Sequence, residues 1–378
     1  MHVTQLLWTR DAGLPGESAE PDSSAHLAFL FGSRESLQNS ASLGAIRLRF
    51  PSAILLGCST AGEILDNRIY DDTVRVTAVR FDATRVAGAS VPIAEPSDSY
   101  AAGAALARTL NAPDLVHLFV LSDGLHVNGS ALVKGLSENL PSTVTLSGGL
   151  SGDGTAFGET IVVFGETVSS RMVAAVGFYG DQLKVGCASL GGWDSFGAER
   201  LVTRSEGNVL YELDGFSALD LYKRYLGEHA SDLPGSGLLF PLSIRNPEDD
   251  SSVVRTILAV DDEAQSLTFA GDVPVGWYGR LMKANFDRLI DGAVGAARAS
   301  LGGETRRPDL AILISCVGRR MVLRQRTEEE LEGVRDVVGP DALLTGFYSY
   351  GEISPFTPDA RCALHNQTMT ITSFQEGR

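Results

Sequence analysis

The sequence predicts an α/β fold of two related halves, each built from β-α-β units with mixed sheets. Short apolar runs bounded by turn residues recur along the chain and are typical of buried strands. Helical stretches join these runs at a spacing of about 30 residues, which fits a β-α-β unit. Two glycine-rich turns, GCSTAGEI at 57–64 and GFYSYGEI at 346–353, are nearly alike. We infer an old duplication.

The first copy of the pattern begins with the apolar run 26–31. A helix is expected over 35–48, and a second strand at 53–56 leads into the turn at 57–64. A further strand, 74–81, follows that turn.

The last copy has the same order, with strands at 310–315 and 343–344 before the turn at 346–353. The spacing of Thr327 and Glu330 predicts a capping box at the start of the intervening helix. A strand at 364–372 follows the turn and matches the one after the first turn.

A middle stretch repeats the pattern more loosely, with strands at 115–121 and 144–146 and a helix over 129–140. Whether it is a true copy or a coincidence stays open. Its loop, GGLSGDG at 148–154, lacks the oxygen spacing of a calcium loop and the GK[ST] ending of a P-loop. We expect a tight turn there, although Asp153 also suggests a cation site.

The domain boundary is placed just before Val209, which gives domains at 26–207 and 208–375. The polar stretch 11–25 has little to bury, so we take residues 1–25 as a mobile N-terminal segment.

Between the two halves, residues 209–215 predict a hairpin, followed by a helix through Tyr225. Apolar residues at helical spacing predict another helix from 278 to about 300.

Composition limits the partners and the compartment. The chain has 378 residues and a net charge of −16, which disfavours nucleic acid and anionic membranes. It contains no apolar run of the roughly 20 residues that cross a bilayer and no signal-peptide pattern. We therefore expect a cytoplasmic protein. Its four cysteines form no CxxC pair, so they predict free thiols rather than a zinc site or a disulfide framework.

These motifs resemble the FIST (F-box and intracellular signal transduction) family over nearly the whole chain. The turn at 57–64 resembles the N-terminal signature. Five segments resemble the C-terminal one: 209–215, 269–274, 315–319, 346–353 and 365–368.

The resemblance implies a bacterial sensory domain that binds a small ligand, with amino acids proposed for the family. Some members are haem proteins that sense nitric oxide and regulate a histidine kinase. This chain carries no attached kinase, cyclase or methyl-accepting segment, so we expect a separate signalling partner such as a histidine kinase.

The two turns carry most of the candidate ligand-binding residues, because glycines allow close backbone approach and consecutive amides can form an anion-binding nest. Either glutamate of the turns suits a ligand ammonium, caps its own turn, or pairs across the halves. The candidates are Cys58, Ser59, Thr60, Gly62, Glu63, Arg319, Ser349, Tyr350, Gly351, Glu352 and Asn366.

Arg319 ends a buried strand, where α/β sheets usually place ligands. Arg319 and Glu352 would hold the two ends of a zwitterionic amino acid, or would pair with each other.

If haem is bound, His365 is the first choice of axial ligand, followed by His117 and His126. A structural histidine is the alternative, and covalent attachment is excluded because there is no CxxCH.

A hydrolase using Cys58 or Ser59 with His117 or His126 is a further alternative, and a scaffolding protein is another. Because no motif pairs a nucleophile with a base, we expect a binding protein and not an enzyme.

Overall fold

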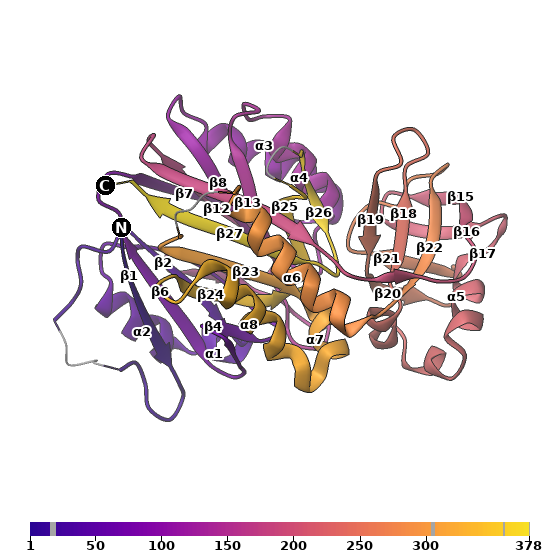
Figure 1. The fold of residues 1–378 in the computed structure, drawn as a ribbon, viewed down its shortest axis with the longest axis horizontal. Coiled ribbons are helices and arrows are strands. Elements are labelled where there is room, and N and C mark those ends of the chain that lie inside the picture. The colour runs from indigo at the N-terminus through magenta and orange to yellow at the C-terminus, as the bar shows by residue number, and fades with distance from the viewer. Residues whose placement is uncertain (16–19, 304–306, 358–359, 378) are drawn as a thin grey trace.

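The computed structural model describes residues 1–15, 20–303, 307–357 and 360–377. Over these residues the strands form three six-stranded sheets and one nine-stranded sheet. The three six-stranded sheets pack together into a core, and the nine-stranded sheet forms a lobe at one end of the molecule (Figure 1). No helix among the described residues is both long and apolar enough to span a membrane.

The first sheet contains the first copy of the sequence pattern, and two of its central strands, β2 and β3, are parallel. Its strands, in order across the sheet, are β1 (His2–Trp8), β6 (Val74–Arg80), β2 (Leu27–Gly32), β3 (Ile54–Ser59), β10 (Val162–Phe164) and β11 (Thr167–Ser169).

The second sheet contains the middle copy, with β8 and β9 parallel. Its order is β7 (Arg85–Pro92), β12 (Met172–Tyr179), β8 (Leu115–Ser122), β9 (Thr145–Leu150), β25 (Gly351–Pro355) and β26 (Cys362–His365).

The third sheet contains the last copy, with β23 and β24 parallel. Its order is β13 (Leu183–Leu190), β27 (Met369–Glu376), β23 (Leu310–Cys316), β24 (Leu343–Ser349), β4 (Glu63–Leu65) and β5 (Arg68–Tyr70). All three sheets therefore follow one plan, and the middle copy of the pattern is a true repeat.

The three repeats exchange hairpins in a cycle. The hairpin β4–β5 follows β3 in the chain but pairs with β24 of the third sheet. In the same way β10–β11 crosses from the second repeat to β3, and β25–β26 crosses from the third repeat to β9. Each sheet is thus mixed, as the sequence predicts, and each is completed by another repeat.

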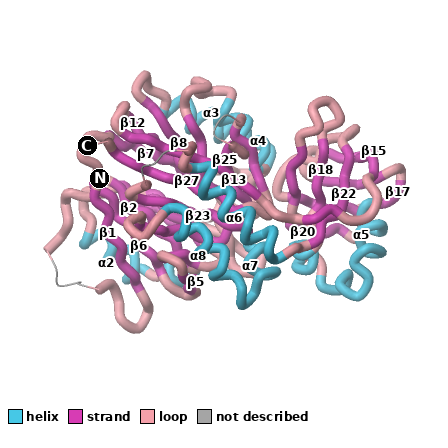
Figure 2. The backbone as a smooth tube through the Cα atoms, in the orientation of Figure 1, coloured by secondary structure: helices cyan, strands magenta, loops and turns pink. Residues whose placement is uncertain are grey.

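Helices cover the outer faces of the sheets (Figure 2). The helices of the core are α1 (Arg34–Gln38), α2 (Ser40–Arg49), α3 (Ser99–Leu110), α4 (Gly129–Ser137), α6 (Phe286–Ser300), α7 (Val317–Leu323) and α8 (Thr327–Val338). Short 3₁₀ turns lie at Pro96–Asp98, Gly227–Asp232, Gly235–Leu239 and Arg324–Arg326. The helices α3 and α4 pack together over the second sheet, and α6 and α8 over the third.

The inner faces of the three sheets share one apolar core. Phe29 of the first sheet meets Phe119 of the second, and Phe31 meets Phe347 of the third. All four side chains are buried. Burying a phenylalanine contributes about 1.5–3 kcal/mol, so these contacts hold the sheets together.

The lobe is built from residues between β13 and α6. Its strands are β14 (Asp194–Ser195), β15 (Arg200–Glu206), β16 (Val209–Leu213), β17 (Phe216–Ser217), β18 (Leu242–Arg245), β19 (Ser252–Arg255), β20 (Ile257–Asp261), β21 (Ser266–Phe269) and β22 (Tyr278–Lys283), with α5 (Ala218–Leu226) packed beside them. The antiparallel pair β16–β17 confirms the predicted hairpin at 209–215.

Four expectations from the sequence need correction. The strand expected at 364–372 is divided into β26 and β27, which lie in different sheets. The helix expected over 35–48 is divided into α1 and α2, because Asn39 caps the start of α2. Residues 278–300 are not one helix: Tyr278–Lys283 pairs with β18, and the helix begins only after Asn285, whose side chain accepts the Arg288 N–H as an N-cap. The segment 1–25 is not wholly loose, because His2–Trp8 pairs with β6 along its length. Residues 16–19 of that segment lie outside the described residues.

Candidate functional site

The turns that follow β3, β9 and β24 meet at one end of the core. Three backbone hydrogen bonds join these turns. In each bond the N–H of a residue in one repeat donates to a carbonyl oxygen of another repeat, so that the three bonds form a ring. They are Ala61 to Tyr348 at 2.8 Å, Tyr350 to Leu150 at 3.3 Å, and Gly152 to Ser59 at 2.9 Å. The two predicted turns are therefore direct neighbours, and the loop at 148–154 completes the set.

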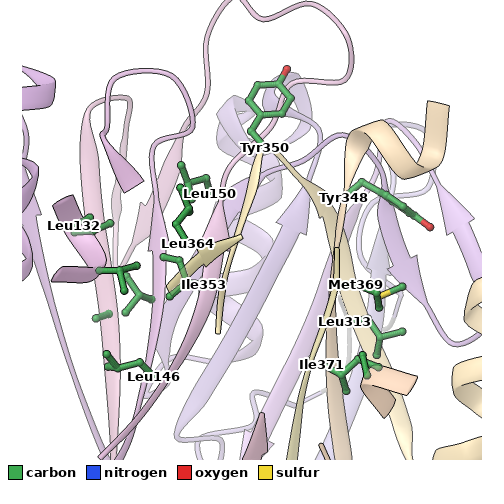
Figure 3. Packing of buried hydrophobic residues seen from close by; sticks show 14 of the residues in the cluster. Leu132, Leu146, Leu150, Leu313, Tyr348, Tyr350, Ile353, Leu364, Met369 and Ile371 are labelled. Carbon is green, nitrogen blue, oxygen red and sulfur yellow. The ribbon is translucent and has the colours of Figure 1, made fainter. Parts of the chain in front are cut away.

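Tyr350 lies between β24 and β25, beyond the apolar residues that pack below it. Figure 3 shows it pointing away from Leu150, Ile353 and Leu364, which lie close together in the core. Its hydroxyl donates a hydrogen bond to Asp153 of the middle repeat.

Glu63 begins β4 and is almost fully buried. One carboxylate oxygen accepts the Thr60 hydroxyl at 2.8 Å, and the other accepts the Thr73 hydroxyl at 2.8 Å. Burial raises the pKa of Glu63 to about 7, and the bonds from Thr60 and Thr73 oppose that rise. The carboxyl group is thus poised to change its charge near neutral pH.

Glu352 has the same surroundings in the third repeat. It accepts the Ser349 hydroxyl at 2.7 Å and the Thr368 hydroxyl at 2.8 Å, and it is fully buried. Burial raises its pKa to about 8, opposed by the same two hydroxyls. Each glutamate therefore ties its own turn to the threonine that precedes the last strand of its repeat. The sequence left three alternatives for each glutamate: binding a ligand ammonium, capping its own turn, or pairing across the halves. These contacts match the second alternative.

A cavity of about 170 Å³ distinguishes the two glutamates. Glu63 lines it together with Thr60 and Gly62, whereas Glu352 is not among the residues that do. The volume exceeds the 10–15 Å³ needed for one water but is below the range of pockets for drug-sized molecules. We call it the Glu63 cavity, and it has room for a small solute.

The wall of the Glu63 cavity is strongly acidic. Its titratable lining residues are Arg34, Glu35, Glu63, Asp71, Asp72 and Asp153. Most of these carboxylates already have donors: Glu35 pairs with Arg34, Asp71 pairs with Arg320, and Asp153 accepts the N–H groups of the loop 157–159.

Glu63 and Asp72 remain without an ion pair among the residues that the structure describes. Arg75 and Arg320 act on Glu63 electrostatically without pairing with it. Two carboxyl groups that face one small cavity without an ion pair favour a ligand that brings its own positive charge.

Gly62 shapes the edge of this cavity. Its φ is +125°, and a Cβ there would lie 2.3 Å from the Nη1 atom of Arg320. That guanidinium donates to the Ala61 carbonyl at 2.7 Å and to Asp71. Glycine is required here because it allows both the backbone conformation and the approach of Arg320.

Arg319 does not take part in this site. It forms an ion pair of 2.8 Å with Glu330, and both side chains are fully buried. Neither alternative for Arg319, a ligand carboxylate or Glu352, matches these contacts. The predicted capping box is also wrong, because Glu330 faces β23 and β24 and accepts the hydroxyls of Ser315 and Tyr348.

Other predicted ligand residues are held by the protein. The Oγ of Ser59 accepts the Ile161 N–H at 3.0 Å. Asn366 is fully buried and donates to the Tyr350 carbonyl at 3.1 Å. Gly351 packs against Leu150 and Asn366, where a Cβ would meet both side chains at 3.0 and 3.2 Å. These residues shape the turns from within.

Neither candidate nucleophile, Cys58 or Ser59, has a histidine as a hydrogen-bond partner among the described residues. Cys58 is buried between the sheets, and burial raises the pKa of its thiol. His117 bonds to Thr145 and Ser147, and burial lowers its pKa to about 3. His126 contacts Asp123 at 3.3 Å instead of either candidate nucleophile.

The surroundings of His365 do not fit an axial haem ligand. Its Nε2 lies 2.9 Å from the Ser354 carbonyl oxygen, and its ring packs against Phe356. Burial lowers its pKa to about 4. Iron coordination through Nε2 would require the loss of this hydrogen bond. Within the described ranges, no group of three His, Cys, Asp or Glu residues could hold a metal ion.

The sequence analysis missed several residues of the Glu63 cavity. Arg34 is the first residue of α1, and Asp71 and Asp72 lie in the short connection between β5 and β6, so no recognisable motif marks them. The adjacent pair Asp71–Asp72, placed between two short strands, is the one local signal that could have drawn attention to them.

Comparison with known families decides the classification. The FIST N domain model matches residues 26–216, and the FIST C domain model matches residues 218–355. The chain belongs to the FIST family. FIST domains are in general sensory domains for small ligands in signal transduction. The two matches meet near residue 217, and the three structural repeats are divided between them.

Two solved structures are similar to this FIST protein over almost its whole length. A cyanuric acid hydrolase from A. caulinodans has 8% identity and a TM-score of 0.39, with 100% of this chain and 98% of that one covered. A chorismatase has 9% identity and a TM-score of 0.34, with 98% of each chain covered. The search of curated proteins found no match.

Proposed function

We propose that this FIST protein is a sensory module that binds a small ammonium-bearing solute, such as an amino acid, in the Glu63 cavity. The observation that supports this most is the acidic cavity itself, in which Glu63 and Asp72 form no ion pair with any described residue. An ammonium group there would supply the missing charge. Arg34, which also lines the cavity, would face the carboxylate of an amino acid.

A link between binding and protonation follows from the pKa of Glu63. Without ligand, its pKa of about 7 leaves the group partly protonated at neutral pH. A bound ammonium favours the carboxylate, so it lowers this pKa and releases a proton. Affinity should therefore rise with pH up to about 7 and then level off. Below pH 7 it should fall by at most about tenfold per pH unit.

The cavity lies beside the ring of three turns, which joins all three repeats by backbone bonds. A ligand that changes the position of the first turn would act on the other two through these bonds. We propose that a separate protein, such as a histidine kinase, reads this change. Such a shift requires that the ligand bind one conformation more tightly than another.

The function proposed is binding and not catalysis. Cys58 and Ser59 have no histidine as a hydrogen-bond partner among the described residues, which supports this choice. A thermal-shift screen of amino acids, alkylamines and short carboxylates tests the proposal. A ligand at 100 times its dissociation constant should add about 2.7 kcal/mol of stability.

The repeats offer a matched pair of variants for this screen. Glu63→Gln should abolish the shift, because it removes the charge that faces the cavity. Glu352→Gln changes an equivalent buried carboxyl with equivalent partners and should keep the shift. Binding of carboxylates in preference to amines, or equal loss in both variants, would contradict the proposal. A ligand effect on the autophosphorylation of a candidate kinase tests the signalling step.

A further inference from the structure

A second and larger cavity lies where the lobe meets the core. It has a volume of about 770 Å³, within the range of pockets that hold small organic molecules. Its walls are α4, β26 and the end of β19, so both the core and the lobe contribute to it. We call it the Arg255 cavity. It shares no lining residue with the Glu63 cavity.

Arg255 is the unusual residue of this cavity. Its side chain is buried, with only 6% of the residue exposed, and it forms no ion pair with any described residue. Its guanidinium donates to neutral oxygens: the carbonyls of Asp272 and Leu364, each at 3.0 Å, and the Ser130 hydroxyl at 3.3 Å. Burial lowers its pKa to about 10, so it is still a cation at neutral pH. The Asp272 carboxylate acts on Arg255 electrostatically but does not pair with it, and it already accepts the Asn128 amide. A buried cation without a direct ion pair is costly, so an added anion would compensate it.

Most of the other charged residues that line the cavity are also positive. Lys134 lies one turn after Ser130 on α4, so both face the cavity, and Arg361 adds a third cation. Among the described lining residues, Glu138 is the single carboxylate, and it already accepts the Tyr100 hydroxyl at 2.7 Å. This basic lining stands out in a chain with a net charge of −16.

Apolar side chains complete the cavity away from Arg255. Leu140, Val144 and Leu146 line it beyond the end of α4. From Ser130 to Ser137 the helix rises by about 10 Å, which separates the basic end from the apolar end. A ligand that fills both ends must carry a negative headgroup and an apolar body.

We propose that the Arg255 cavity binds an amphipathic organic anion, with its carboxylate or phosphate at Arg255 and Lys134 and its apolar body against Leu140 and Val144. Such a ligand would contact both the lobe and the core. Two existing contacts already join them here: the Asp272 N–H donates to Ser130 at 3.1 Å, and Asn128 donates to the Asp272 carboxylate at 2.7 Å. The ligand would thus add to a junction that the protein has already formed.

Calorimetric titration of the full chain with decanoate, decyl phosphate and decanol tests the proposal. At least one anion should bind at least about tenfold more tightly than decanol, a difference of about 1.4 kcal/mol. The ratio between the two anions tells which headgroup the site prefers. Equal affinity for decanol, or no binding of either anion at millimolar concentration, would overturn the proposal.

Variants locate the binding. Arg255→Met should remove anion binding, but it also disturbs the junction with the lobe. Lys134→Gln avoids that problem because Lys134 is exposed on α4, and it should weaken anion binding by about threefold to tenfold without affecting decanol. Lys283→Gln, an exposed change outside the cavity, should leave anion affinity unchanged. Unchanged affinity in Lys134→Gln would place the anion elsewhere and refute the assignment.

Discussion

The buried pair Arg319–Glu330 supports the third sheet from inside. Glu330 projects from α8 toward β23 and β24, where it accepts two hydroxyls and pairs with the Arg319 guanidinium. Arg319 also donates to the carbonyls of Gly191 and Leu289. The pair thus connects six segments, namely α6, α7, α8, β23, β24 and the residues after β13, and neither side chain has access to water. We predict that Glu330→Gln strongly destabilises the fold.

The magnitude follows from what the substitution leaves behind. Glu330→Gln removes the negative charge but keeps the buried Arg319 cation. The new amide nitrogen also faces donors. Breaking a buried ion pair in this way costs about 3–5 kcal/mol. Replacing both members by apolar residues, as in Arg319→Met with Glu330→Leu, should cost less than the two single changes added together, because no unpaired charge stays behind.

Urea unfolding followed by circular dichroism measures these differences. Glu329→Gln is the matched control, because Glu329 precedes Glu330 on α8 but pairs with Arg326 at the exposed surface. That control should leave stability nearly unchanged. A loss below about 1 kcal/mol in Glu330→Gln would refute the reasoning, since it would mean that the charge is not essential to this core.

Two further predictions concern the turns. The pKa values of Glu63 and Glu352 are raised in the folded state, so the native protein holds protons that the unfolded chain releases, and stability should decrease as pH rises from about 5 to 8. Glu63→Gln and Glu352→Gln should each reduce this loss of unfolding free energy between pH 5 and pH 8 by a few kcal/mol, as measured by urea unfolding at both pH values. A loss equal to that of the unaltered protein would contradict the pKa shifts. Gly62→Ala should cost about 1–3 kcal/mol because the new Cβ meets Arg320 at a positive φ. Gly44→Ala on α2, where a Cβ meets nothing within 4 Å, should not destabilise, and equal losses in both variants would refute the role given to Gly62.

Much of the architecture could be predicted because its signals are local. The continuous apolar runs at 26–31, 115–121 and 310–315 became the central strands β2, β8 and β23. The exchange of hairpins between sheets could not be predicted, because it depends on pairing between residues such as Glu63 and Phe347 that are far apart in the chain. The true helix start at Phe286 was missed because residues 278–283 have apolar spacing that suits either a strand or a helix.

The candidate site was predicted in part for the same reason. Thr60, Gly62 and Glu63 form one short motif, and they do line a cavity. Its remaining walls come from distant segments around Arg34, Asp72 and Asp153, which only the folded chain brings together. The partner of Arg319 was also missed, because the Thr327-Glu-Glu-Glu330 pattern fits a capping box as well as it fits a buried ion pair.

The central claim is that a ligand ammonium meets Glu63 in its cavity, and proton release on binding tests it most directly. Calorimetry of the best ligand from the screen, at pH 7 in two buffers of different ionisation enthalpy, measures this quantity. The predicted result is the release of about half a proton per site by the unaltered protein and by Glu352→Gln, and none by Glu63→Gln. Proton uptake on binding, or equal release by Glu63→Gln, would contradict the claim.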